Sequence, residues 1–166
     1  MYPCDYNQHA IMDKESKEKK YRLLEVELSA LISAKDGLIS NLANFTAAVN
    51  NHFNFFWIGF YLVQDKQLSL GPFQGPVACT KIAYGKGVCG VSWSKNKTIL
   101  VADVHQFPGH IACSSETNSE IVVPLLNSAG HVMAVLDIDS IEFDYFDEID
   151  QRFLEKIIKW FASEVY

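Results

Sequence analysis

Cys113 lies in the middle of a polar segment with the sequence HIACSSETNSE (residues 110–120). Small polar residues favour an exposed loop, whereas structural cysteines are more often found in apolar runs. A thiol in an exposed loop is accessible to reactants. We therefore regard Cys113 as a candidate nucleophile or redox-active residue.

Two further cysteines precede it, and the three residues Cys79, Cys89 and Cys113 are separated by 10 and 24 positions. Cys4 lies outside the predicted domain. The sequence has no C-x-x-C motif, so neither a zinc ribbon nor a thioredoxin-type motif is present. Cys89 follows two glycines near a predicted helix start, where a thiolate is stabilised.

Other interpretations of the cysteines stay open. Each thiol could be inert and half-buried, which is the usual state of a lone cysteine. The three cysteines together with His105 or His110 could bind zinc, although their spacings match no common zinc pattern. A cysteine hydrolase that uses one of these histidines as its base is also conceivable.

The glycine-rich segment YGKGVCGVSW (residues 84–93) is typical of a tight turn into a short helix. It lacks the Lys-Ser/Thr pair of a P-loop, and no long strand precedes it as in a Rossmann unit. A nucleotide site is therefore not predicted, although its backbone amides could hold a small carboxylate.

A cluster of carboxylates is expected from the hairpin EIVVPLLNSAGHVMAVLDID (residues 120–139). A four-residue loop at 127–130 would place Glu120 opposite Asp137, with Asp139 on the same face. Acids crowded in this way share a proton, which raises a pKa. Alternatively, they are solvated acids at strand ends. The other face is purely apolar: Ile121, Val123, Leu125, Val132, Ala134, Leu136 and Ile138.

Aromatic residues form a second candidate feature in the run FNFFWIGFYLV (residues 53–63). Trp57 and Tyr61 would lie on one side of a strand, with Gly59 between them. The glycine would leave room for a ligand between two aromatic walls. Alternatively, both rings belong to the core.

These residues must be positioned by a mixed fold. Helical spacing of apolar residues predicts helices over residues 14–34, 38–49 and 146–166. Strands are predicted at 53–63, 67–73, 97–104 and in the hairpin, and a loop from His105 to Ser119. We therefore expect one α+β domain, with an antiparallel sheet of about five or six strands flanked by helices.

Composition narrows the function classes. The chain has 166 residues, enough for one domain with a real core. Its net charge of −6 argues against a nucleic-acid partner. The longest apolar run has 11 residues, too short to cross a membrane, and no secretory signal is recognised. We expect a cytoplasmic protein with reduced thiols, a flexible leader at residues 1–13 with Met12 as an alternative start, and a domain at 14–166.

Four segments together resemble one known family. They are FNFFWIGFYLV, GPFQGPVACTKIAYGKGVCGVSW, VADVHQFPGHIACSSETNSEIVVPL and GHVMAVLDIDS followed by FDYFDEID. The set is similar to the free methionine-(R)-sulfoxide reductases, which are stand-alone GAF domains. The resemblance extends over roughly residues 20–165, and it is specific because ordinary GAF sensor domains lack three cysteines at these spacings.

The resemblance implies a role for each matched residue. Cys113 matches the catalytic cysteine, and Cys89 and Cys79 match the recycling thiols. Of these two we favour Cys89 as the first disulfide partner, because of its place near a helix start. The remaining matched positions are the substrate-binding acids and the active-site tryptophan: Glu120, Asp137, Asp139 and Trp57. We add Tyr61 as a second aromatic wall, and Glu120 as the proton donor because it is nearest to Cys113 in sequence.

The resemblance also implies the reaction and its partners. Cys113 would reduce free methionine-(R)-sulfoxide and become a sulfenic acid, a second thiol would form a disulfide with it, and thioredoxin would reduce that disulfide. No metal or organic cofactor is expected. The alternative is a non-catalytic GAF domain that senses a small molecule. The amphipathic first helix could support a homodimer.

Overall fold

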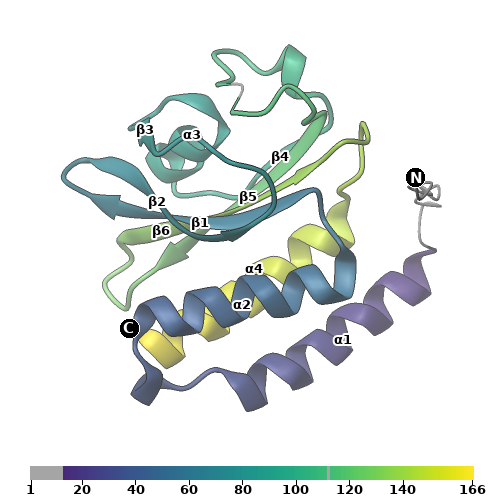
Figure 1. Ribbon diagram of the computed structural model, residues 1–166, viewed down its shortest axis with the longest axis vertical. Helices are drawn as coiled ribbons and strands as arrows, with labels where there is room; N and C mark the ends of the chain where they lie inside the picture. The colour runs from purple at the N-terminus through teal and green to yellow at the C-terminus, as the bar shows by residue number, and fades with distance from the viewer. Residues whose placement is uncertain (1–12, 112) are drawn as a thin grey trace, which may run out of the picture.

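The computed structural model describes residues 13–111 and 113–166 (Figure 1). The predicted leader and Cys4 lie outside the described residues, apart from Asp13 at the start of the first helix. The elements in chain order are α1 (Lys14–Leu31), the 3-10 helix η1 (Ala34–Asp36), α2 (Leu38–Phe53), β1 (Trp57–Gln64), β2 (Gln67–Gln74), β3 (Lys81–Ala83), α3 (Gly87–Lys95), β4 (Ile99–Val101), the 3-10 helix η2 (Val104–Gln106), β5 (Ser119–Leu126), β6 (Val132–Ser140) and α4 (Glu148–Val165).

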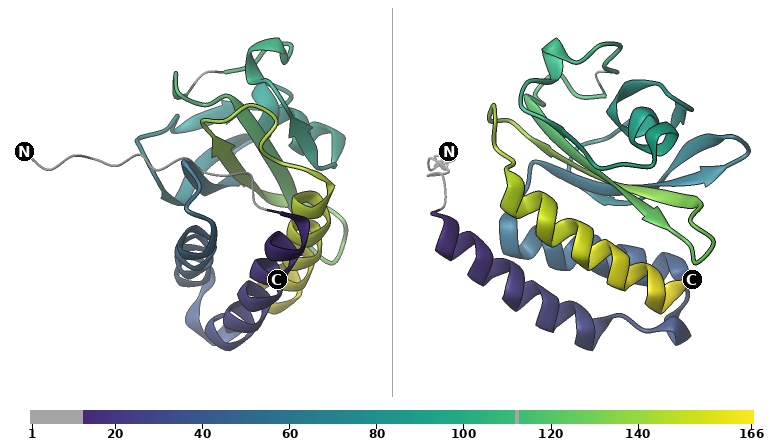
Figure 2. Two further views of the ribbon diagram at one scale, coloured as in Figure 1. Left: turned by 90° about the vertical axis from the view of Figure 1, so that its right-hand side faces the viewer. Right: turned by 180° about the vertical axis from the view of Figure 1, so that it is seen from behind.

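The six strands form one antiparallel sheet in the order β3-β2-β1-β6-β5-β4. Helices α1, α2 and α4 lie on one side of this sheet, with α1 outermost, and α3 and the longer loops lie on the other side (Figures 1 and 2). The α+β class and the six-stranded antiparallel sheet predicted from the sequence are confirmed. No helix among the described residues combines the length and the apolar character needed to cross a bilayer.

Each face of the sheet has its own apolar cluster. The helix side is packed by residues such as Leu24, Phe45 and Phe161, all fully buried. The opposite side holds a smaller cluster that contains Trp57, Tyr61 and Cys89. These predicted site residues therefore lie on the side of the sheet that the three long helices leave uncovered.

Local sequence explains where the long helices begin and end. The carboxylate of Asp13 accepts a hydrogen bond from the backbone N–H of Ser16 and caps α1. Asp147 and Asp150 form a capping box at the start of α4. Asn54, with φ 53°, ends α2 in the left-handed conformation that Asn tolerates.

Several predicted boundaries are wrong. The strand predicted from Phe53 begins at Trp57, because α2 continues through Phe53. The first helix ends at Leu31 rather than at residue 34, and the last begins at Glu148 rather than at residue 146. The three-residue strand β3 was not predicted, since so short a segment has no detectable period.

The predicted hairpin register is wrong by two residues. Glu120 pairs with Asp139 rather than with Asp137, because the loop between the strands has five residues and the ladder shifts between Leu125 and Leu126. An even shift leaves side chains on their predicted faces. Only the residues beside the irregularity change faces: Met133 packs on the helix side and Val132 on the other.

Candidate active site

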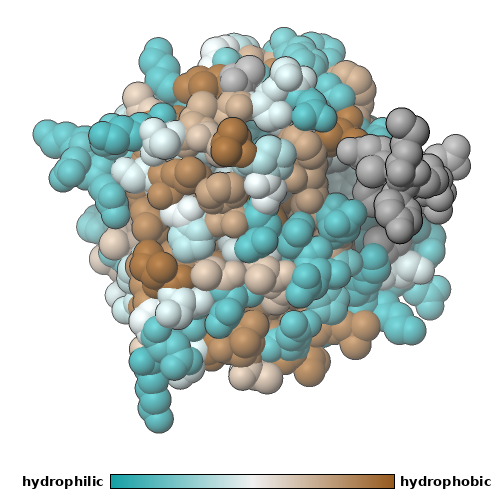
Figure 3. All heavy atoms as spheres, viewed as in Figure 1, coloured by the Kyte–Doolittle hydropathy of each residue, from teal (hydrophilic) through white to brown (hydrophobic). Residues whose placement is uncertain are grey.

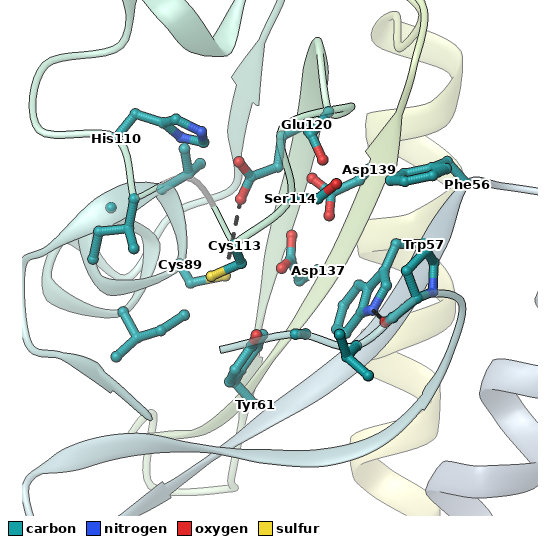
Figure 4. Close-up of a pocket in the computed structure, with 18 residues that line it drawn as sticks. Phe56, Trp57, Tyr61, Cys89, His110, Cys113, Ser114, Glu120, Asp137 and Asp139 are labelled. Atoms are coloured by element: carbon teal, nitrogen blue, oxygen red, sulfur yellow. Dashed lines mark hydrogen bonds between the residues drawn. The ribbon is translucent and has the colours of Figure 1, made fainter. Parts of the chain in front are cut away.

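A pocket opens on the side of the sheet opposite the three long helices (Figure 4). The space between its walls and its open mouth together amounts to about 550 Å³, which includes open solvent. The pocket is lined by β1, β5, β6, α3 and the loop before β5. Of the residues predicted for the site, those that line it are Trp57, Tyr61, Cys89, Cys113, Glu120, Asp137 and Asp139. The remaining predicted residue, Cys79, is bonded to Cys113.

A disulfide joins Cys79 and Cys113, whose Cα atoms are 5.3 Å apart. Cys79 belongs to the loop between β2 and β3, and Cys113 belongs to the loop between η2 and β5. Both residues are half-buried. The sequence analysis favoured Cys89 as the first partner of Cys113; in the structure Cys113 is bonded to Cys79, and the order in which the two thiols react stays a prediction.

Cys89 is a buried free thiol inside α3, with 3% of its surface exposed. Its Sγ lies 3.9 Å from Oε1 of Glu120 (Figure 4). Burial raises the pKa of Cys89 well above its ordinary value, and the neighbouring charges of Asp137 and Glu120 raise it further. The expectation of a lowered pKa at the helix start is therefore wrong, because burial and nearby carboxylates outweigh the helix terminus.

Three carboxylates converge in the pocket (Figure 4). Glu120 is opposite Asp139 in the β5–β6 ladder, and Asp137 is opposite Gly59 in the β1–β6 ladder. Glu120 and Asp137 are only 5% and 6% exposed. The predicted cluster on this face is therefore present, although with a different pairing.

The electrostatics of this cluster favour protonated acids. Burial, and then the charges of the other two carboxylates, raise the pKa of Glu120 well above its ordinary value. Burial and the charge of Asp137 do the same for Asp139. Burial raises the pKa of Asp137 to about 6. At neutral pH Glu120 and Asp139 therefore retain protons, whereas Asp137 is mainly ionised.

Trp57 and Tyr61 form one wall of the pocket, with ring centroids 5.9 Å apart. The indole Nε1 donates to the carbonyl of Pro76 at 3.0 Å, and the Tyr61 hydroxyl donates to the carbonyl of Cys79 at 3.1 Å. These two bonds fasten the loop that carries Cys79 to β1. The expected ligand space above Gly59 is not there, because a Cβ at this position would collide with the indole of Trp57.

The two loop histidines differ in position. His110 lines the pocket, and its Nδ1 is buried without a hydrogen-bond partner in the described structure. His105 lies outside, with Nε2 3.1 Å from Oδ1 of Asn118. Burial lowers the pKa of His110, with a further contribution from His105, so its imidazole is neutral at pH 7. The sequence analysis considered His110 only as a zinc ligand or a hydrolase base and did not include it among the predicted substrate-binding residues, although it is three residues from Cys113.

The predicted zinc set of three cysteines and a histidine is not assembled, since Cys79 and Cys113 are bonded to each other. Within the described residues, the group with metal-ligand spacing is Cys89, Glu120 and Asp137, whose ligand atoms lie within 4.8 Å of one another. The raised pKa values of these groups indicate that protons already reduce the charge of this cluster. The surroundings of Cys89, Glu120 and Asp137 therefore suit proton transfer next to a thiol.

Thr117 and Ser114 also line the pocket and were missed by the sequence analysis. They lie in the loop between Cys113 and β5, and the Thr117 hydroxyl partly opposes the rise in the pKa of Asp139. A polar loop residue carries no signal of its own in one sequence, because loops are generally rich in Ser and Thr.

Comparison with known proteins identifies the family. The GAF domain model matches residues 42–159. GAF domain-containing protein A of Dictyostelium discoideum is 51% identical over 149 residues, which cover 89% of this chain and 94% of that protein. A free methionine-R-sulfoxide reductase of Saccharomyces cerevisiae is 42% identical over 151 residues, with 84% of each chain covered.

A solved structure supports the same assignment. The free methionine-R-sulfoxide reductase from Neisseria meningitidis, in complex with its substrate, superposes with a TM-score of 0.83 at 41% identity. The match covers 95% of this chain and 93% of that one. The family predicted from the motifs is thereby confirmed. The chain belongs to the GAF-domain family, in the group that includes the free methionine-R-sulfoxide reductases.

Proposed function

We propose that this protein reduces free L-methionine-(R)-sulfoxide to methionine. The observation that carries the proposal is a disulfide between two half-buried cysteines at a pocket with an aromatic wall and three carboxylates, of which Glu120 and Asp137 are buried and Asp139 is half-buried. Such a disulfide is the product expected when a thiol-dependent reductase completes one turnover. Relatives that bear this activity in their names support the substrate.

Cys113 is the proposed nucleophile. Its thiolate attacks the sulfur of the sulfoxide, the S–O bond breaks, and the oxygen is transferred in net terms to Cys113 as a sulfenic acid while methionine leaves. Cys79 then condenses with the sulfenic acid, and water is released as the disulfide forms. The pairing of Cys79 with Cys113 supports this order. Cys89, buried and protonated, is left without a direct step in the first turnover.

Glu120 is the proposed proton donor for the sulfoxide oxygen. Its pKa is raised by burial and by its two acidic neighbours, so it carries a proton at neutral pH and can act as a general acid. Asp137 has a pKa of about 6 and is mainly ionised at pH 7. The ionised Asp137 therefore suits the substrate's ammonium group, while Asp139, whose pKa is raised well above its ordinary value, would help to hold the proton of the cluster. Trp57 and Tyr61 would contact its methyl-sulfur end.

We further propose that thioredoxin returns the disulfide to two thiols and that the enzyme works in the cytoplasm, where such reductants are present. A homodimer through α1 also remains a proposal, since this helix exposes Leu23 and Val26. Size-exclusion chromatography with light scattering would test the dimer.

The reaction can be tested with dithiothreitol and racemic free methionine sulfoxide. Methionine should form, chiral analysis should find only the S epimer left, and a peptide-bound sulfoxide should react poorly. Consumption of both epimers would contradict a stereospecific pocket. Binding of the sulfoxide without any methionine release would favour the alternative, a GAF domain that senses a small molecule.

A further inference from the structure

We infer that an uncharged apolar rim around the Cys79–Cys113 disulfide is the docking surface for a protein dithiol of the thioredoxin class. The rim consists of Pro76, Val77, Ala78 and Ile111. This inference rests on the proposed function, which produces the disulfide, and goes beyond it by locating the surface that the reductant binds.

The two cysteines are flanked in the same way. Val77 lies two residues before Cys79, and Ile111 lies two residues before Cys113. Val77 is 89% exposed, the highest value among the exposed large apolar residues of the described chain, and Ile111 is 39% exposed. The disulfide brings their loops together, with Cα atoms of the cysteines 5.3 Å apart. Val77 and Ile111 line the same pocket as Cys113, so both lie at the mouth that holds the bond to be reduced.

The segments around the two cysteines are uncharged. Residues 67–80 and 104–115, which include β2 and η2, contain no Asp, Glu, Lys or Arg, although 20% of the chain is charged; Lys81 and Glu116 follow them directly. On the face shown in Figure 3, hydrophobic residues gather in front of β2 and α3. Contact surfaces between proteins are depleted of charge at their centre, and exposed apolar patches mark interaction sites. The lack of charge in these two segments therefore favours a protein partner.

The chemistry at the centre of the rim determines the kind of protein. A thiolate of the partner attacks one sulfur of the disulfide, forms a mixed disulfide and releases the other cysteine as a thiol. The partner's second thiol then attacks the mixed disulfide, so that both cysteines here are reduced and the partner is oxidised. Two electrons and two protons pass to this chain. The occupant must therefore carry two thiols close together.

A small dithiol and a protein dithiol should respond differently to changes in the rim. Dithiothreitol reaches the sulfur atoms without burying the surrounding surface, whereas a protein must cover it. Val77 is the best residue to change because its side chain is almost fully exposed, so folding should not depend on it. Ile39 in α2 is a matched control, since it is also a branched apolar residue and is 58% exposed.

The experiment compares Val77→Asp, Ile39→Asp and the wild type with two reductants. One is thioredoxin, kept reduced by thioredoxin reductase and NADPH, and the other is dithiothreitol. Val77→Asp should lower kcat/KM for thioredoxin by about tenfold, the loss typical of one central contact residue. Turnover with dithiothreitol at saturating sulfoxide should fall much less, so that the ratio of the thioredoxin rate to the dithiothreitol rate drops; this ratio is the readout because Val77 also lines the pocket. Ile39→Asp should match the wild type with both reductants.

Three results would overturn the inference: equal thioredoxin kinetics for Val77→Asp and the wild type, an equal loss in Ile39→Asp, or a wild type that cycles with dithiothreitol but not with thioredoxin. Failure of the proposed function is distinguishable, because the wild type would then release no methionine with dithiothreitol.

Val77→Ser provides a second check. It removes the apolar contact without adding charge, and it should show a smaller loss in the same direction.

Discussion

Glu120 on β5 and Asp139 on β6 are direct cross-strand partners, and both side chains face the pocket. Like charges at such a position destabilise a strand pair. Burial and the negative charge of neighbouring acids raise the pKa of both carboxyls well above their ordinary values. The pair therefore keeps a proton at neutral pH, close to the disulfide of Cys113. A transferable proton held by the fold is what reduction of a sulfoxide requires.

The first prediction concerns Glu120→Gln. Glutamine keeps the shape of the side chain but has no acidic proton, so single-turnover reduction by Cys113 should slow by about 10² to 10⁴, the usual contribution of general acid catalysis. Wild-type rates should fall as pH rises through the pKa of the cluster. Glu120→Gln should lack this dependence.

Glu116→Gln is the matched control, because Glu116 is an exposed glutamate in the loop just before β5, four residues from Glu120. It should react at the wild-type rate. Wild-type speed and an unchanged pH profile in Glu120→Gln would show that Glu120 is not the acid.

The second prediction distinguishes the two recycling candidates. Cys79→Ser should release one equivalent of methionine but should not cycle, because Cys113 loses the partner to which it is bonded. Cys89→Ser should still form the Cys79–Cys113 disulfide and cycle with dithiothreitol. Cys113→Ser should be folded and inactive. Thiol counts and mass-spectrometric disulfide maps after substrate addition would test this. A Cys89–Cys113 bridge in the wild type would contradict it.

The third prediction concerns stability. The pKa of Asp137 is raised to about 6 from an ordinary 3.8, so the folded state binds this proton more tightly than the unfolded state. The resulting stabilisation is fully present below pH 3.8 and is lost as pH rises through about 6. The Asp137→Asn variant should not lose stability in this way as pH rises, because asparagine is uncharged at every pH in the range.

Relative to the wild type, Asp137→Asn should therefore gain about 2 kcal/mol in the free energy of unfolding between pH 4 and pH 7, since pH 4 to pH 7 spans most of the shift of the pKa from 3.8 to about 6. Urea unfolding at several pH values measures this. Asp65→Asn, an exposed change in a turn whose φ of 48° asparagine tolerates, is the control and should be flat. A pH-independent difference for Asp137→Asn would contradict the raised pKa. The variant should also bind substrate more weakly.

The sequence predicted the long elements because their apolar periods are strong. Residues such as Phe153 and Ile157 in α4 repeat at helical spacing and are buried as expected. The carboxylate cluster was also predictable despite the wrong register. Side chains alternate along a strand, so the even error left Glu120 and Asp137 on one face. Loop length and the ladder irregularity set the register itself, and neither has a clear signal in one sequence.

The disulfide pairing could not be predicted because it depends on contacts between distant segments. The argument for Cys89 was local, since it rested on a nearby helix start. Its burial beside Glu120 is a tertiary effect, and it reverses the expected shift of the pKa. Similarly, Gly59 was predicted to leave room for a ligand, but the ring of Trp57 folds over it. Side-chain rotation of this kind does not follow from strand alternation.

The last prediction concerns the contact that joins α1 to α4. The Nζ of Lys17 donates to Asp150 at 2.6 Å and to Asp147 at 2.9 Å. The Tyr21 hydroxyl donates to the other oxygen of Asp150 at 2.8 Å. Burial opposes the charge on Lys17, but the hydrogen bonds and charges of both aspartates raise its pKa. The ion pair is therefore retained inside the protein, where Asp150 is 1% exposed.

Lys17→Met fills the same space without a charge and leaves Asp150 buried without a cation. Removing one partner of a buried ion pair typically costs about 3–5 kcal/mol, so urea unfolding at pH 7 should show a loss of this size. The loss should shrink at pH 4, since Asp150 without its lysine can then take up a proton. Lys19→Met, an exposed change on the same helix, should have little effect. Equal stability of Lys17→Met and Lys19→Met would show that α1 is held by apolar packing alone.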